Sequence, residues 1–140
     1  MPGRHSALAI GRLVLGMALL LAPVVAAAGH GASGLVPGYR VEHVKRLIDA
    51  GERLVLVDVR SPAAFGKGRL PGARSVPLGE LARRAVEVPR SGRVILYGET
   101  IIDASEAAKL LEPLGYRNIG VLEDGFNGWV AAGLPLERPR

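Results

Sequence analysis

The sequence predicts an α/β fold of three layers, in which helices cover both faces of a mostly parallel sheet of about five strands. Two strand patterns carry this prediction, LVLV at 54–57 and RVILY at 93–97, because apolar runs without alternation are typical of parallel strands buried on both faces. Strand and helix patterns alternate along the chain, as in parallel α/β sheets, whose binding crevices lie at the carboxyl ends of the strands. We therefore expect a site where four loops meet, those after Asp58, Val76, Tyr97 and Leu122.

Apolar spacing and turn signals locate the individual elements. In the first helix, Val41, Val44, Leu47 and Ile48 share one face, and Gly51 suits the position just past the last turn. In chain order, the predicted elements are a short strand near Tyr39, a helix at 41–51, strands at 54–57 and around 75–76, a short helix at 78–88, a strand at 93–97, a helix at 103–115, a strand at 118–124 and a helix that starts at 125 and stops before Gly133 and Pro135.

The helix predicted at 103–115 has the strongest local signals. Asp103 and Glu106 have the spacing of an acidic capping box, so we expect Asp103 to be a plain N-cap. The inward face of this helix is expected to consist of Ala107, Leu110, Leu111 and Leu114.

The first 28 residues have the pattern of a secretory signal peptide. Basic residues precede an apolar run at 13–28, which ends in small residues with Ala26 and Ala28 placed for cleavage. The run is shorter than the roughly 20 apolar residues of a membrane-spanning helix, so cleavage is favoured over an uncleaved anchor. We therefore expect export to the periplasm or the cell exterior. The predicted order is a signal peptide at 1–28, a flexible leader at 29–38, one globular domain at 39–137 and a tail at 138–140.

Composition excludes several kinds of chemistry. Cysteine is absent from all 140 residues, so disulfides, thiolate nucleophiles, persulfides and Cys-ligated metals are excluded. The three histidines are scattered and form no metal cluster or catalytic dyad by their spacing, and we expect no metal or cofactor. The formal net charge is +5, but no aromatic residues interleave with the basic ones as a base-stacking surface requires. Nucleic acid is therefore not an expected partner.

Two long segments of the chain carry a family pattern. LVLVDVRSPAAFGKGRLPGARSVP, at 54–77, matches without gaps an Asp-Val-Arg segment followed by a Gly-His-Ile-Pro-Gly-Ala turn, and LGYRNIGVLEDGFNGWVAAGLPLE, at 114–137, matches an ending that includes Gly125 and Trp129. In this order the segments resemble the rhodanese-like family over residues 39–137. The resemblance implies the rhodanese α/β fold and would ordinarily imply sulfurtransferase activity.

The loop after the strand at 93–97 departs from that family. Active members carry Cys-x-x-Gly-x-Arg there, and the Cys takes up sulfane sulfur as a persulfide. The aligned positions of this chain hold Gly98, Ile101 and Asp103. Gly98 has no side chain and cannot act as a nucleophile. Ile101 resists the positive φ that Gly adopts. Glu99 and Asp103 place carboxylates at a helix N-terminus, where an anion would otherwise be held. The departures therefore indicate a degenerate member of the family, and we expect no turnover and no catalytic residue.

The same loop is the candidate contact site for a ligand or a protein partner. Its residues are Gly98, Glu99, Thr100, Ile101, Ile102 and Asp103, and Arg60, Phe126 and Trp129 are expected on the rim of the crevice. Ile101 and Ile102 are expected either to fold inward as a plug, which is the favoured alternative, or to contact a partner. Asp58 is expected to hold the loop that follows it.

Two functions from different classes follow. The first is an exported, catalytically inactive rhodanese-like domain that serves as a binding or regulatory module. The second is a thiosulfate-type sulfurtransferase, or low-level acid–base activity by Asp58 with Glu99 at the same crevice.

Overall fold

The computed structural model describes residues 36–140, and the predicted signal peptide lies outside them. Five strands form one sheet in the order β1-β5-β4-β2-β3, and all named strand pairs within the described residues are parallel. The mostly parallel sheet of about five strands is therefore confirmed. The strands are β1 (Gly38–Tyr39), β2 (Leu54–Asp58), β3 (Arg74–Ser75), β4 (Arg93–Tyr97) and β5 (Ile119–Leu122).

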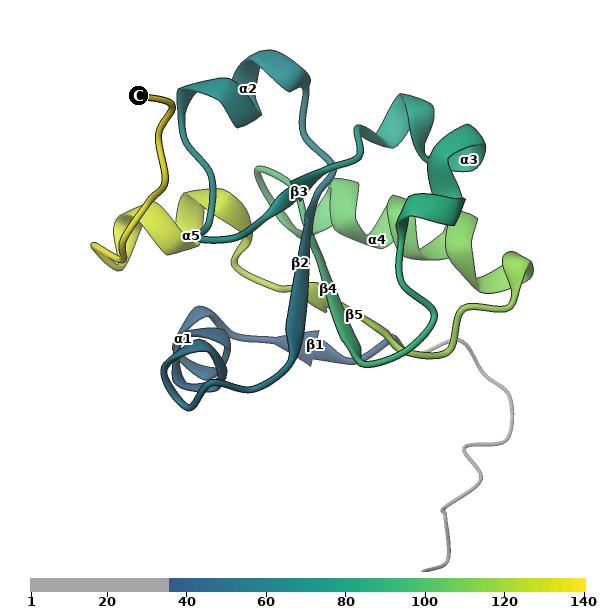
Figure 1. Cartoon of the computed structure of the whole chain (residues 1–140), viewed down its shortest axis with the longest axis horizontal. Helices are drawn as coiled ribbons and strands as arrows, with labels where there is room; N and C mark the ends of the chain where they lie inside the picture. The colour runs from purple at the N-terminus through teal and green to yellow at the C-terminus, as the bar shows by residue number, and fades with distance from the viewer. Residues whose placement is uncertain (1–35) are drawn as a thin grey trace, which may run out of the picture. The chain divides into compact units, whose positions relative to one another are not determined.

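Helices cover both faces of this sheet. The helices α1 and α5 lie on one side, α3 and α4 lie on the other, and α2 lies beyond the carboxyl end of β2 (Figure 1). Their bounds are α1 (Val41–Asp49), α2 (Pro62–Lys67), α3 (Leu81–Arg84), α4 (Ile101–Leu111) and α5 (Gly125–Ala131), with short 3₁₀ segments η1 (Leu78–Glu80), η2 (Ala85–Glu87) and η3 (Glu112–Leu114). The predicted three layers are confirmed.

Successive residues of the central strands serve two separate cores. Leu56 and Ile95 pack under α1 and α5, whereas Val57 and Leu96, the next residues along each strand, pack under α3 and α4. Side chains alternate between the faces of a strand, so a strand covered on both faces must be apolar at successive positions. This explains why the two strand patterns showed no alternation.

The first helix ends where its sequence predicts. Gly51 has φ of +70°, and the N–H groups of Gly51 and Glu52 donate to the carbonyl oxygens of Ile48 and Leu47. A residue with left-handed backbone closes the helix in this way, and glycine adopts that backbone without steric cost.

The capping prediction for α4 is wrong. Thr100 is the N-cap, and its Oγ1 accepts a hydrogen bond of 3.3 Å from the N–H of Ile102. Asp103 therefore lies in the first turn, and Glu106 pairs with Lys109 at 2.8 Å. The physical reason is that an earlier hydroxyl side chain on extended backbone already satisfies the free N–H group.

The predicted inward face of α4 is also partly wrong. Ala104, Ala107, Ala108 and Leu111 are buried, whereas Leu110 and Leu114 are exposed. The small alanine side chains let the helix pack closely against the sheet, and the chain turns into η3 before Leu114.

The short helix predicted at 78–88 is divided into η1, α3 and η2. The hydroxyl of Tyr116 contacts the carbonyl oxygens of Ala85 and Val88. The carbonyl oxygen of Ala85 also accepts the N–H of Val88 at 2.9 Å, which closes η2, and these carbonyl oxygens are thus bonded by a side chain from another part of the chain. Within residues 36–140, no helix combines the length and apolar character that a bilayer crossing requires.

Candidate functional site

The loop after β2 is built around a buried ion pair. Nε and Nη2 of Arg60 lie 3.0 Å and 2.7 Å from the two carboxylate oxygens of Asp58, and Nη2 also donates to the carbonyl oxygen of Gly68 at 2.7 Å. Asp58 accepts the backbone N–H of Arg60 as well, at 2.9 Å. The side chains are 0% and 3% exposed for Asp58 and Arg60. Asp58 thus holds the loop that follows it, as predicted.

Arg60 also joins this loop to two other parts of the site. Its guanidinium carbon lies 3.7 Å from the centroid of the Phe126 ring, and Nη1 lies 3.5 Å from Oε1 of Glu99. Burial works against the charge of Arg60, but hydrogen bonding and attraction from Asp58 offset it and raise the pKa of Arg60 above its ordinary value. Arg60 therefore remains charged and links the ends of β2, β4 and β5.

Tyr97 closes the end of β4 beneath these groups. Its side chain is fully buried, and its hydroxyl oxygen accepts a hydrogen bond of 3.2 Å from the N–H of Leu70. Burial raises the pKa of Tyr97, and the nearby Asp58 carboxylate raises it further. The phenol therefore stays protonated, and a phenolate nucleophile is disfavoured.

The degenerate loop has no room for a side chain at its first position. A Cβ placed on Gly98 would lie 2.6 Å from Cβ of Asp103 and 3.1 Å from its Oδ2. Asp103 therefore fills the space that a side chain at position 98 would need. The loop carbonyls of Gly98 and Glu99 accept hydrogen bonds from the N–H groups of Phe126 and Asn127, at 2.8 Å and 3.1 Å. The first N–H groups of α5 are thus used within the protein.

The predicted plug is wrong. Ile101 is 40% exposed and Ile102 is 67% exposed. Both begin α4, whose buried face starts at Ala104, so the helix directs these two residues outward. They leave the crevice open.

The rim prediction is wrong for one of its three residues. Trp129 is 0% exposed and packs in the core beneath α1, where its Nε1 donates to the carbonyl oxygen of Pro135 at 2.8 Å. Its position on α5 turns it toward the sheet, away from the side on which Val130 is exposed. Arg60 and Phe126, by contrast, line a cavity together with Glu99.

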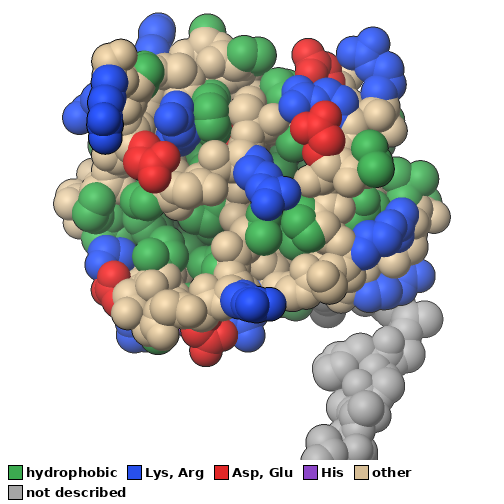
Figure 2. All heavy atoms as spheres, viewed as in Figure 1, with side chains coloured by type: hydrophobic (Ala, Val, Ile, Leu, Met, Phe, Trp, Pro, Cys, Tyr) green, Lys and Arg blue, Asp and Glu red, His purple; other side chains and the backbone are tan. Residues whose placement is uncertain are grey.

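This cavity, named here the α2–α5 cavity, has a volume of about 480 Å³. Figure 2 shows hydrophobic side chains gathered on one face of the molecule, with Lys, Arg, Asp and Glu side chains around them. The lining residues are Arg60, Ser61, Ala63, Ala64, Lys67, Gly68, Glu99, Phe126, Val130, Leu136 and Arg138.

The sequence prediction missed the contribution of the C-terminal segment to this cavity. Arg69 and Glu137 form an isolated antiparallel bridge, and Oε1 of Glu137 accepts the N–H of Gly72 at 2.8 Å. These bonds place Leu136 and Arg138 at the cavity. The short tail carries no periodic pattern, so only the fold reveals its position.

A second cavity lies on the other side of the loop after β2, and we name it the acidic cavity. It has a volume of about 520 Å³, and its charged lining residues are Arg60, Glu80 and Asp103. Asp103 and Glu99, which were expected to act together at one anion site, therefore face different cavities.

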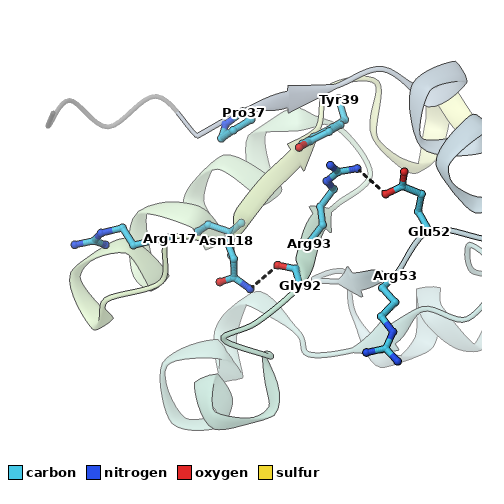
Figure 3. A pocket seen from close by; sticks show the side chains of 9 residues that line it. Pro37, Tyr39, Glu52, Arg53, Gly92, Arg93, Arg117 and Asn118 are labelled. Carbon is cyan, nitrogen blue, oxygen red and sulfur yellow. Dashed lines mark hydrogen bonds and ion pairs between the residues drawn. The ribbon is translucent and has the colours of Figure 1, made fainter. Parts of the chain in front are cut away.

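A third hollow, of about 420 Å³, lies at the amino ends of the strands and includes Arg53, Arg93 and Arg117. Figure 3 shows Arg93 turned toward Glu52, whereas the other two guanidinium groups point away in different directions. Asn118 donates to the carbonyl oxygens of Pro89 and Gly92, and its buried Oδ1 has no partner among the described residues. The charged groups of this hollow do not converge on one point.

Among residues 36–140, no group of three or more His, Asp and Glu side chains is placed to hold a metal ion. The candidate site therefore consists of a buried Arg–Asp pair, an aromatic ring, a loop without a nucleophile and two cavities of different charge.

Comparison with known proteins places this site in a family. The rhodanese-like domain model matches residues 40–132, and the chain belongs to that family. A sulfurtransferase from Allochromatium vinosum is 32% identical over 95 residues, which are 68% of this chain and 88% of that protein. The solution structure of a rhodanese-like domain from Anabaena has a TM-score of 0.68 at 26% identity, and the match covers 75% of this chain and 81% of that one.

A further relative is named as a regulator. A helix-turn-helix type transcriptional regulator from Mycobacterium tuberculosis is 35% identical over 100 residues, and the match covers 70% of this chain but only 43% of the regulator. Rhodanese-like relatives thus include both sulfurtransferases and a regulator, and the chain described here has no cysteine.

Proposed function

We propose that this chain is an exported rhodanese-fold module without sulfurtransferase activity. It binds a ligand or partner at the carboxyl ends of its strands. One observation carries the proposal: the position of the family's nucleophile is Gly98, and the Asp103 side chain fills the space beside it. Persulfide chemistry needs a thiol, and none of the 140 residues is cysteine.

The loop supports the loss of activity in a second way. An anion held at this loop would need unoccupied N–H groups in a positive field. Here Thr100 caps α4, the N–H groups of Phe126 and Asn127 bond loop carbonyls, and Asp103 adds a negative charge in the first turn. These contacts stabilise the loop in the absence of any sulfur anion.

An accessory or regulatory role is supported by two observations. The crevice stays open because Ile101 and Ile102 face outward, and a cavity lies beside the loop. A relative that is a transcriptional regulator contains the matched segment as less than half of its length. A domain of this kind therefore forms one part of a protein that is named as a transcriptional regulator.

The alternative function is thiosulfate-type sulfur transfer, which the name of the Allochromatium relative favours. Acid–base chemistry by Asp58 with Glu99 is weaker, because the Asp58 carboxylate is 0% exposed and bonded to Arg60. A base needs access to a substrate proton within hydrogen-bond reach.

Turnover of thiosulfate and cyanide to thiocyanate tests the proposal. We expect no thiocyanate above a heat-denatured control, and no mass increase of one sulfur on the intact protein after incubation with thiosulfate. Turnover by the wild-type chain, or a sulfur-loaded form, would overturn the proposal.

Variants of the loop separate the missing nucleophile from the altered surroundings. Gly98→Cys alone is expected to stay inactive, because Asp103 occupies the space for the thiol. The triple variant Gly98→Cys, Ile101→Gly, Asp103→Arg restores the family pattern and is expected to gain turnover. Activity of Gly98→Cys alone would show that Asp103 does not block the site.

Export is tested separately, in a bacterial host that expresses the full chain. Fractionation and N-terminal sequencing are expected to find the protein outside the cytoplasm with Gly29 as its first residue. A full-length chain in the membrane fraction would support the uncleaved anchor instead.

A further inference from the structure

We propose that the α2–α5 cavity binds a small organic anion with an apolar body. This inference rests on the proposed function in one respect, namely that the crevice serves binding and not turnover. It assigns the ligand by its chemistry: an apolar portion that contacts the walls of the cavity and an acidic group that faces its basic edge.

The walls of the cavity define the apolar portion. Phe126 and Leu136 are half-buried, and their remaining surface lines the cavity with Val130. Ala63 and Ala64 of α2 form the facing wall and are small enough to leave the space open. The volume of about 480 Å³ is within the range of roughly 300 to 1,000 Å³ that is typical of small-molecule pockets. Apolar walls of this size favour a ligand with a hydrocarbon or aromatic body.

The charges around the cavity define the acidic group. The buried carboxylate of Asp58 neutralises Arg60, so this guanidinium adds little net charge. Glu99 contributes one negative charge, and Lys67 and Arg138 contribute two positive ones. None of the ion pairs found within residues 36–140 involves Lys67 or Arg138. The balance is positive and favours an anion.

The position of Asp103 explains why an anion is accepted here and not on the other side of the loop. Its carboxylate lines the acidic cavity together with Arg60 and Glu80, of which Arg60 is paired with Asp58 and Glu80 with Arg84. The repulsion expected from the two loop carboxylates is therefore divided: Asp103 acts on the acidic cavity, and Glu99 in the α2–α5 cavity lies beside Arg60. The two neighbouring cavities share Arg60 but differ in the charges that are unpaired among residues 36–140, which are Lys67 and Arg138 in the α2–α5 cavity and Asp103 in the acidic cavity.

Two fluorescent probes of similar size test this assignment on the full chain. The anionic probe is 8-anilinonaphthalene-1-sulfonate, and the neutral probe is N-phenyl-1-naphthylamine, which lacks the sulfonate. We expect the anionic probe to bind with a 1:1 stoichiometry and more tightly than the neutral one. No saturable binding of the anionic probe, or tighter binding of the neutral one, would overturn the inference.

Charge-reversal variants locate the binding. Lys67→Glu with Arg138→Glu is expected to raise the Kd of the anionic probe about tenfold. The Kd of the neutral probe is expected to change by less than about twofold. The matched control is Arg53→Glu with Arg83→Glu, which makes the same change in net charge at positions outside the cavity. Equal weakening by both pairs would show that only the net charge of the protein matters, and the inference would fail.

A substitution in the wall tests the apolar part. Val130→Asp is expected to weaken both probes, and the exposed position of Val130 lets the chain keep its fold, which circular dichroism checks. Unchanged binding of both probes in a folded Val130→Asp variant would place the site elsewhere. A protein or peptide that binds this face without displacing the anionic probe would also contradict the assigned ligand.

The test is independent of the sulfurtransferase assay. Absence of probe binding with absence of turnover would sink this inference and leave the proposed function standing. Turnover by the wild-type chain with probe binding intact would sink the proposed function and leave the cavity as a site for an organic anion.

Discussion

The two ends of the parallel strands, named here the carboxyl edge and the amino edge of the sheet, carry similar ion pairs in different surroundings. At the carboxyl edge, Arg60 and Asp58 are 3% and 0% exposed and 2.7 Å apart. At the amino edge, Arg93 and Glu52 are 40% and 52% exposed and 3.7 Å apart. Loops from several strands fold over the first pair, whereas solvent reaches the second. Burial, and not the presence of an Arg–carboxylate pair, therefore distinguishes the end of the strands that holds the candidate site.

The cavities at the two edges differ in the same way. The α2–α5 cavity has apolar walls, and Lys67 and Arg138 are among its lining residues. The hollow at the amino edge has three arginines, but their guanidinium groups point in different directions (Figure 3). The cavity at the carboxyl ends of the strands combines apolar walls with basic groups, so it is the better candidate for an organic anion.

The largest expected effect comes from removing one member of the buried pair. Arg60→Met leaves Asp58 buried without its partner and is expected to lower the free energy of unfolding by about 3 to 5 kcal/mol. Arg93→Met at the amino edge is expected to cost less than about 1 kcal/mol. Urea unfolding at pH 7 measures both.

A double substitution checks the reason for that difference. Asp58→Asn with Arg60→Met removes both charges, and it is expected to be less destabilised than Arg60→Met alone. If the changes in unfolding free energy of the two single substitutions simply add, the unpaired buried charge is not the cause of the large loss in Arg60→Met.

A second comparison concerns two glycines with left-handed backbone. Gly125, at the carboxyl ends of the strands, has φ of +62°, and a Cβ there would overlap the carbonyl oxygen of Glu99. Gly51, near the amino edge, has φ of +70° and no other atom within 4 Å of such a Cβ. Both alanine variants carry backbone strain, but Gly125→Ala is expected to cost about 1 to 3 kcal/mol more because it also presses on the loop backbone. Equal midpoints of thermal unfolding for Gly125→Ala and Gly51→Ala would show that the loop backbone moves aside at no cost in stability.

The third prediction concerns Tyr97 and alkaline pH. The pKa of Tyr97 is raised in the folded protein by burial and by Asp58, whereas an unfolded tyrosine titrates near about 10. Above about pH 10 the unfolded chain loses a proton that the folded chain keeps, so the free energy of unfolding falls as pH rises. Below that pH the stability from this group is fully present.

Tyr97→Phe isolates this contribution. The variant is expected to lose about 1 kcal/mol at pH 7, because the N–H of Leu70 loses its acceptor, and to show a shallower fall above pH 10. Urea unfolding at pH 7, 10 and 11 gives both quantities. Tyr39→Phe, at a half-buried tyrosine that lines the hollow with Arg93, is the control. A slope unchanged by Tyr97→Phe would contradict the buried phenol as its source.

Local patterns predicted most of the elements but not their caps and faces. The unbroken apolar strands and the glycine after α1 were correct because each depends on neighbouring residues only. The cap of α4 failed because two acceptors competed and Thr100 came first along the chain. Its inward face failed because closely packed alanines, which show little hydrophobic contrast, were buried in preference to Leu110.

The candidate site was predicted in part. Arg60 and Phe126 lie at a cavity because loops at the carboxyl ends of parallel strands meet, which the alternation of strands and helices already implies. Trp129 was misplaced, since one position along a helix decides between core and surface. Lys67 was missed because a lone lysine on a short helix gives no signal by itself.

The amino-acid sequence by itself determined the parallel α/β sheet, the membership in the rhodanese-like family and the lack of any thiol for sulfur chemistry. These features depend on composition and on spacing along the chain. Only the tertiary structure decided that Asp103 fills the space beside Gly98, that Glu99 and Asp103 face different cavities, and that Glu137 anchors the C-terminal segment to Gly72, which is 65 residues away in the sequence. Such contacts join distant segments, and packing, not local pattern, sets which of them form.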